Sequence, residues 1–209
     1  MRYEKRNAVA CMAELRKIRN AAVATVDENG RPQVRMIDVM LAEGEKLYIC
    51  TARGKAFYQQ LMNGGQVALV AMNKQFQMFR VNGSAVRLDH QKEWIDKIFC
   101  ANPAMNEVYP GNSRYVLEAF CILSGQVEFF DLGVSPIVRQ TFVFGKQNKE
   151  FYGFSISDRC IGCGTCAAVC PQQCIERGAP FKIRQENCLH CGLCVEKCPV
   201  SCIERGIET

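Results

Sequence analysis

The sequence of 209 residues contains no apolar run that approaches the ~20 residues needed to cross a bilayer. Its first residues, Met1 to Arg6, are charged and lack the apolar region of a secretory signal. No basic run is interleaved with aromatic residues, which argues against nucleic acid as a partner. We therefore expect a cytoplasmic protein that binds neither a membrane nor a nucleic acid.

Dinucleotide and phosphate motifs are missing as well. No Gly-x-Gly-x-x-Gly follows a strand and opens a helix, and no Walker-type loop is present, so a nicotinamide cofactor is not expected as the direct electron donor. The net charge of +5 lies in residues 1–154, which hold 20 Lys and Arg against 15 Asp and Glu. Residues 155–209 hold six of each sign. The excess suits an anionic cofactor or substrate.

Cysteine, in contrast, is abundant, since ten of the 14 cysteines lie between Cys160 and Cys202. A disulfide framework would need a secreted chain with a small core, and neither condition is met. Thiols spaced by two residues in a reducing compartment indicate metal binding instead. The four isolated cysteines are expected to be small buried hydrophobic residues: Cys11, Cys50, Cys100 and Cys121.

The cysteine-rich segment is an internal repeat. The pattern Cys-x-x-Cys-x-x-Cys-x-x-x-Cys-Pro begins at Cys160 and again at Cys188, and residues 158–178 match residues 186–206 at a constant offset of 28. Zinc knuckles are the alternative reading, but zinc needs two Cys-x-x-Cys pairs per ion. It gives no reason for three cysteines in a row and a fourth before proline, twice. The repeat predicts two pseudo-symmetric halves that bind iron-sulfur clusters.

Residues 155–209 resemble a bacterial two-cluster ferredoxin. In that family the first three cysteines of one run and the fourth cysteine of the other bind each 4Fe-4S cluster. The resemblance implies that the first cluster is bound by Cys160, Cys163, Cys166 and Cys198, and the second by Cys188, Cys191, Cys194 and Cys170. We expect Cys174 and Cys202 to pack at the cluster edges. His190 is interpreted as a solvent-facing spacer, with a hydrogen bond to a cluster sulfur as the alternative.

The upstream pattern predicts an α+β fold, a small antiparallel β-barrel with flanking helices. Helices are expected over residues 4–19, 54–62 and 89–100, the first with Val9, Met12, Leu15 and Ile18 on its buried face. Five to seven strands are expected from residues 21–26, 33–41, 46–51, 66–72, 75–88, 115–132 and the segment after 141. A bulge is predicted at Gly83 and a break at Ser124-Gly125. The predicted domains are residues 1–150 and 155–209.

Residues 21–85 resemble the pyridoxamine-phosphate-oxidase-like FMN-binding split barrels. The resemblance is carried by Pro32-Gln-Val-Arg35, by the run from Leu47 to Lys55, and by the strand from Gln77 to Gly83. It implies a flavin site made of Arg35, Thr51, Arg53, Lys55 and Gln77, with the phosphate at a helix N-terminus. Oxidases of that family carry a lysine where this chain has Met40, which argues against pyridoxamine phosphate oxidation. The alternative is that Arg35, Arg53 and Lys55 bind no cofactor and form a solvated basic edge.

Together the two resemblances imply an oxidoreductase in which two 4Fe-4S clusters pass electrons to FMN, or to a deazaflavin, for reduction of a small-molecule acceptor. An external one-electron donor protein would supply the clusters, and split barrels of this kind imply a homodimer. Tyr58, Tyr109 and Arg114 are candidates to orient the substrate or supply a proton. The alternatives are an electron-transfer adaptor that serves a partner protein and, with no Cys-x-x-Cys-His motif to favour it, a haem-binding or haem-degrading barrel.

Overall fold

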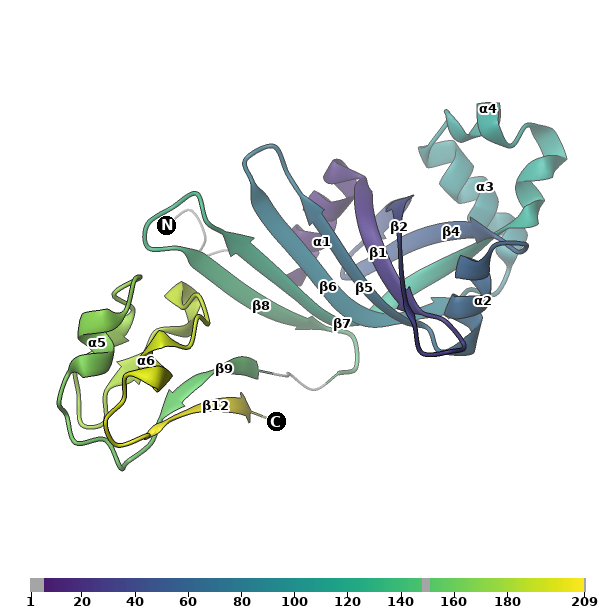
Figure 1. Ribbon diagram of the computed structural model, residues 1–209. Helices are drawn as coiled ribbons and strands as arrows, with labels where there is room; N and C mark the ends of the chain where they lie inside the picture. The colour runs from purple at the N-terminus through teal and green to yellow at the C-terminus, as the bar shows by residue number, and fades with distance from the viewer. Residues whose placement is uncertain (1–5, 148–150, 209) are drawn as a thin grey trace. The chain divides into compact units, whose positions relative to one another are not determined.

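The computed structural model describes residues 6–147 and 151–208, and the chain divides into two compact units (Figure 1). The first unit holds the described residues up to 73 together with 78–128 and 142–147. The second unit holds 74–77, 129–141 and the described residues after 147. The second unit thus includes segments upstream of the predicted boundary near residue 150.

Eight of the described strands form one antiparallel sheet in the order β2-β1-β5-β6-β7-β4-β3, with β8 paired to β7, and all but residue 77 of β6, the end of β7 and the start of β8 belong to the first unit. The sheet curls into a half-barrel (Figure 1), which confirms the predicted α+β barrel class. The strand count exceeds five to seven because the predicted strand 33–41 ends at Asp38 and a separate short strand follows at residues 41–43. The strands are β1 (Asn20–Val26), β2 (Pro32–Asp38), β3 (Leu41–Glu43), β4 (Lys46–Ala52), β5 (Gln66–Met72), β6 (Gln77–Arg87), β7 (Leu117–Asp131) and β8 (Val138–Phe144).

The predicted hairpin at the start of the sheet is present. β1 and β2 pair in continuous register, with Val23 opposite Arg35. The turn between them is stabilised by Asp27, whose Oδ1 accepts hydrogen bonds from the backbone N–H groups of Asn29 and Arg31, both at 2.9 Å. Gly30 follows at a φ of +75°, a conformation that glycine adopts without steric cost. This register fixes which face of β2 carries Arg35.

Two glycines bring β6 and β7 close together. The pairing of β6 with β5 runs through Gly83 in continuous register, so the predicted bulge is absent on that side. β7 continues through Ser124 and Gly125, so the predicted break is wrong. A Cβ atom on Gly83 would lie 2.5 Å from the carbonyl oxygen of Ser124, and one on Gly125 would lie 2.2 Å from that of Asn82. The glycines are required because the two backbones touch where a side chain would stand.

Four helices accompany the sheet: α1 (Ala8–Ile18), α2 (Ala56–Asn63), α3 (Gln91–Ala101) and α4 (Met105–Val108). The Asn7 side chain caps α1 by accepting the backbone N–H of Ala10 at 2.9 Å. The predicted face of α1 is wrong at Val9, which is 44% exposed, because the helix buries Ala8 and Cys11 beside Met12 and Leu15. Within the described ranges no helix is long and apolar enough to cross a membrane.

The isolated cysteines differ in exposure. Cys11 and Cys121 are buried, as predicted, and Cys50 is half-buried. The prediction is wrong for Cys100, which is exposed on the solvent side of α3. Burial raises the pKa of the Cys50 thiol to about 12, so this thiol stays protonated at neutral pH.

The second unit carries the internal repeat. Its backbone conformation repeats at the sequence offset of 28, since Gly164 before α5 and Gly192 before α6 both have positive φ, at 79° and 82°. Gln173 and Ser201 form a second matching pair at 49° and 47°. The elements are β9 (Phe151–Ile156), α5 (Thr165–Val169), β10 (Ile175–Glu176), β11 (Lys182–Ile183), α6 (Leu193–Glu196) and β12 (Ile203–Glu208), with β9 paired to β12 and β10 to β11. The two halves therefore have equivalent local backbone.

Candidate functional site: two thiol-lined pockets and a basic helix start

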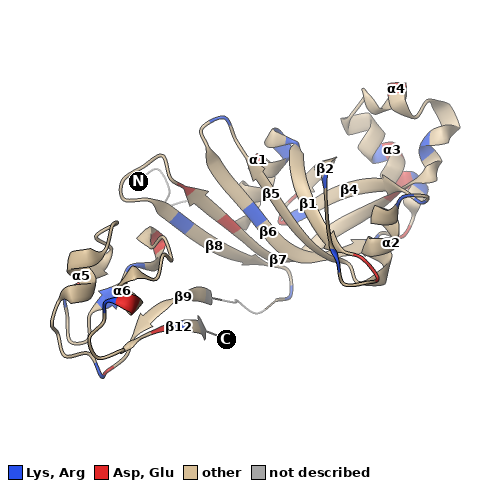
Figure 2. Ribbon diagram, in the orientation of Figure 1, with Lys and Arg blue, Asp and Glu red and all other residues tan. Residues whose placement is uncertain are grey.

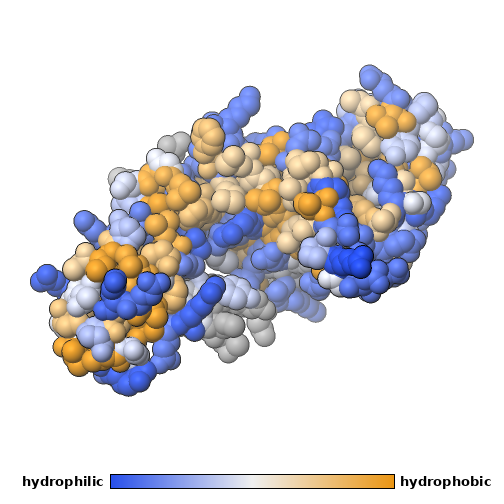
Figure 3. Space-filling model, viewed as in Figure 1, coloured by the Kyte–Doolittle hydropathy of each residue, from blue (hydrophilic) through white to orange (hydrophobic). Residues whose placement is uncertain are grey.

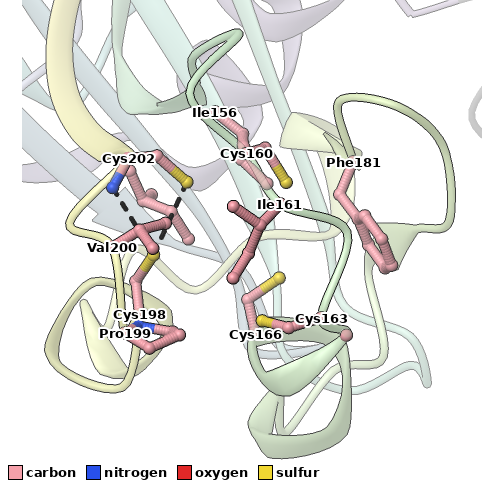
Figure 4. A pocket seen from close by; sticks show the side chains of 12 residues that line it. Ile156, Cys160, Ile161, Cys163, Cys166, Phe181, Cys198, Pro199, Val200 and Cys202 are labelled. Carbon is pink, nitrogen blue, oxygen red and sulfur yellow. Dashed lines mark hydrogen bonds between the residues drawn. The ribbon is translucent and has the colours of Figure 1, made fainter.

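The first pocket lies in the second unit and contains an empty volume of about 290 Å³. Figure 4 shows sulfur atoms from both halves of the repeat around it, with Ile161 and Phe181 among the apolar side chains that line it. The loop before α5 supplies the first two cysteines of the first run, α5 itself supplies the third, and the segment after α6 supplies the last cysteine of the second run. Five thiols line this pocket: Cys160, Cys163, Cys166, Cys198 and Cys202.

The second pocket, of about 340 Å³, mirrors the first. Its apolar walls include Phe154 and Ile183, and its five thiols are Cys188, Cys191, Cys194, Cys170 and Cys174. Each pocket therefore gathers the first three cysteines of one run, the fourth cysteine of the other run and the cysteine four residues after that. The four ligands that the ferredoxin resemblance implies are brought together in each pocket, and several thiols in an apolar pocket fit an iron-sulfur cluster.

Backbone N–H groups bias some of these thiols toward the thiolate, the form that binds metal. Hydrogen bonds from the backbone of Phe181 and Gly162 lower the pKa of Cys160. The backbone N–H of Cys202 lies 3.4 Å from Cys198 Sγ and is the main cause of the lowered pKa of that thiol. Burial has the opposite effect on Cys194 and raises its pKa to about 11.

Cys174 and Cys202 lie at the edges of the two pockets. They are 1% and 2% exposed, and each Sγ is 3.5 Å from the sulfur of Cys170 or Cys198 respectively. Both thiols also line the pockets, so the packing role expected for them stays a prediction. Across residues 6–147 and 151–208, no three His, Cys, Asp or Glu side chains are placed to hold a single metal ion.

His190 is half-buried, so its interpretation as a solvent-facing spacer is wrong. Its Nδ1 atom lies 2.9 Å from Nη1 of Arg139, and its ring meets Phe154 edge-on at 6.3 Å between centroids. Its backbone N–H donates to Cys188 Sγ at 3.4 Å. Burial raises the pKa of Cys188, while the charge of Arg139 and the His190 N–H oppose that rise.

In the first unit, Arg35 is held against α2. Its Nη1 donates to Thr25 Oγ1 at 2.5 Å and its Nη2 to Gln60 Oε1 at 2.8 Å, while the guanidinium lies 4.6 Å from the Phe57 ring centroid. Burial lowers the pKa of Arg35. Thr25 and Gln60 were not predicted, because only pairing across β1, β2 and α2 reveals their role. Arg35 is thereby preorganised by side chains of a strand and a helix.

Three other predicted flavin residues lie where β4 leads into α2. Thr51 is buried on β4, and Lys55 is exposed at the N-cap of α2 without a capping side-chain hydrogen bond. Arg53 Nη1 donates to the carbonyl oxygen of Tyr115 at 2.8 Å. Arg53 also lines an open cavity of about 860 Å³ together with Lys92.

Gln77, the fifth predicted flavin residue, belongs to the second unit, whereas the other four belong to the first. Its Nε2 donates to Oδ2 of Asp131 at 2.7 Å.

Sequence reasoning did not find the role of Glu118. This buried carboxylate of β7 accepts hydrogen bonds from both Nε and Nη2 of Arg87 and from the hydroxyl of Tyr58, and it lies 3.6 Å from Arg53 Nη1. Hydrogen bonding from Arg87 lowers the pKa of Glu118. The sequence signal that could have indicated this role is the position of Glu118 as the one acidic residue in the apolar segment 117–123. Glu118 also orients Arg53 beside the cavity.

The three candidate substrate-contacting residues have structural contacts. Tyr58 is committed to Glu118, and Tyr109 packs against the apolar cluster around α3. Arg114 lies 4.7 Å from the Phe99 ring centroid and donates to the carbonyl oxygen of Gly111 at 2.9 Å. Their proposed catalytic contacts stay predictions.

A curled antiparallel sheet with a basic helix start, in one chain with two thiol-lined pockets, defines a redox protein of the split-barrel and iron-sulfur class. The model of the pyridoxamine 5'-phosphate oxidase family matches residues 9–114, just over half of the sequence, and a 4Fe-4S dicluster domain model matches residues 154–199. The chain belongs to the pyridoxamine 5'-phosphate oxidase family and carries a 4Fe-4S dicluster domain. No curated protein matches the chain significantly.

Solved structures share the barrel fold. A NimC/NimA family protein from Clostridium acetobutylicum aligns with a TM-score of 0.54 at 21% identity, over 64% of this chain and 89% of that one. A haem-binding protein from Mycobacterium smegmatis aligns with a TM-score of 0.52 at 13% identity, over 66% of this chain and 59% of that one. PhzG from Burkholderia lata, in complex with tetrahydrophenazine-1-carboxylic acid, aligns with a TM-score of 0.50 at 15% identity, over 68% and 83%. At these identities the alignments show the fold alone.

Proposed function

We propose that the protein is a flavin-dependent oxidoreductase in which two 4Fe-4S clusters pass electrons to FMN for reduction of a small acceptor. The observation that carries the proposal is the presence, in one chain, of two pockets lined by five thiols each and a barrel of the pyridoxamine 5'-phosphate oxidase family. Clusters carry one electron at a time, whereas a flavin exchanges one or two, so the combination couples single-electron supply to two-electron chemistry.

The chain's own residues would serve binding and orientation. Lys55, Arg53 and the first N–H groups of α2 would hold the flavin phosphate, because two cations and a helix N-terminus favour an anion. Arg35 would contact the flavin from a position that Thr25 and Gln60 hold in place. Glu118 would orient Arg53 without touching the cofactor.

We further propose a cytoplasmic homodimer that receives electrons from a one-electron donor protein. Support for the dimer comes from the outer face of β2 and β5, where Val34, Met36, Val70 and Met72 are 36% to 73% exposed (Figure 3). An exposed apolar stripe of this kind is typical of a protein interface. A second copy of this chain would cover it. Sedimentation at micromolar concentration tests this, since a monomer would contradict it.

The cofactor part of the proposal is tested by anaerobic purification. We expect about eight irons and eight sulfides per chain, with FMN as the flavin that acid releases. Lys55→Ala should retain several-fold less flavin, whereas Lys46→Ala, at the exposed start of β4, should not change it. Brown protein without releasable flavin would refute the flavin role, and a deazaflavin would correct the identity of the cofactor.

Activity is tested with dithionite-reduced protein and quinones, nitro compounds or enones as acceptors. Turnover by the protein alone supports the oxidoreductase. If the loaded protein reduces none of them but reduces a partner protein, it is an electron-transfer adaptor instead.

A further inference from the structure

At one left-handed position, one half of the repeat has glycine and the other half has a side chain. Gly162 before Cys163 and His190 before Cys191 are equivalent at the offset of 28, and both have positive φ, at 69° and 58°. A left-handed conformation costs a residue other than glycine about 1 kcal/mol. A Cβ on Gly162 would meet no atom within 4 Å. The first half therefore uses the residue with the lower backbone energy, whereas the second half carries a side chain that makes contacts.

The main contact of that side chain is with Arg139, whose Nη1 lies 2.9 Å from His190 Nδ1. A guanidinium group can only donate, so Nδ1 accepts and the ring proton is on Nε2. The backbone of the same histidine donates to Cys188 Sγ at 3.4 Å. A permanent positive charge is thus linked through one residue to a ligand of the second pocket, and that residue immediately precedes another ligand, Cys191.

Arg139 is held in place by the segment that carries it. It lies on β8, where Figure 2 shows a basic position, and its guanidinium is 4.6 Å from the Phe130 ring centroid. Two residues earlier, the backbone N–H of Ile137 donates to Gln172 Oε1 at 3.0 Å, and its carbonyl accepts from Asn187 Nδ2 at 2.8 Å. Ile137 is 3% exposed. The end of the β7–β8 hairpin is therefore fixed to the cysteine module within the second unit.

We propose that Arg139 is a positioning residue that, acting through His190, raises the reduction potential of the second cluster above that of the first. Reduction adds negative charge to a cluster, and a fixed cation nearby stabilises the reduced form more than the oxidised form. At the first cluster the equivalent position is Gly162. Two basic residues directly precede ligands of that cluster: Arg159 is paired with Glu204 at 2.7 Å, and Lys197 is exposed to solvent, which screens its charge. An electron that enters the module would therefore reside on the second cluster.

The inference rests on the clusters of the proposed function but not on the flavin, so it is tested by an anaerobic redox titration of the two clusters followed by electron paramagnetic resonance. In Arg139→Gln the ratio of reduced to oxidised second cluster at a fixed potential should fall about tenfold. For a one-electron couple this corresponds to a midpoint potential that is lower by about 59 mV. The first cluster should be unchanged. Arg139→Lys should keep most of the potential because it keeps the charge.

Two further variants separate the charge effect from folding. His190→Gly copies the first half, relieves the backbone and removes the link, so it should lower the same potential. Arg159→Gln removes an equal charge that is ion-paired and should leave the second cluster unchanged. The affected cluster is identified by Cys191→Ser, which alters the signal of the second cluster only. Unchanged potentials in both Arg139→Gln and His190→Gly, or equal shifts of both clusters, would overturn the proposal, whatever the flavin content.

Discussion

Glu118→Gln should destabilise the barrel unit, because it removes the carboxylate shared by Arg87, Arg53 and Tyr58. The Glu118 side chain is 7% exposed, whereas those of Arg87 and Arg53 are 40% and 49% exposed. Breaking a fully buried pair costs about 3–5 kcal/mol. Here the two arginines can rehydrate once the carboxylate is gone, so we expect the free energy of unfolding to fall by about 2 kcal/mol.

The same variant has a pH signature. Hydrogen bonding from Arg87 lowers the folded-state pKa of Glu118 below the unfolded value of about 4.3. A depressed pKa contributes stability that is present above the unfolded value and is lost as pH falls through the folded value. The difference in unfolding free energy between wild type and variant should therefore be full at pH 7 and should narrow as pH falls below about 4.

The measurement is urea unfolding followed by fluorescence of Trp94, the single tryptophan, which stacks on Tyr48 at 4.8 Å between centroids in the first unit. Glu128→Gln is the matched control, since Glu128 pairs with an Arg80 side chain that is 46% exposed and should contribute less than about 1 kcal/mol. A loss in Glu118→Gln no larger than in this control, or a difference that does not depend on pH, would refute the reasoning.

Three further outcomes are expected. Cys163→Ser should lose about half of the iron, whereas Cys174→Ser should keep it, as measured by iron and sulfide counts; equal losses would contradict the ligand assignment. With the clusters intact at pH 8, a thiol reagent should label exposed Cys100 well before Cys50, whose pKa is about 12, and peptide mass spectrometry would show the order. Gly125→Ala should destabilise the barrel by about 2 kcal/mol or more, since its Cβ would meet a backbone oxygen; an unchanged urea midpoint would disprove that close contact.

Local patterns predicted most of the individual elements. Alternating apolar residues located β1, β4 and β5, and the glycines after Asn63 marked the end of α2. The errors came from features that depend on a neighbouring strand. Gly83 and Gly125 look like a bulge and a break when each strand is read alone, but they serve a contact between two strands. Similarly, the exposure of Cys100 depends on which side of α3 packs on the sheet.

The sequence by itself determined the chemistry of the cysteine module, because the number and spacing of its thiols are local properties that repeat at a constant offset. It also determined the family, through short motifs along β2, β4 and α2. Only the tertiary structure decided what surrounds those motifs. Glu118 meets Arg87 from another strand, and Arg139 meets His190 across 51 positions of sequence. Such contacts depend on how strands and loops pack, and spacing along the chain carries no information about them.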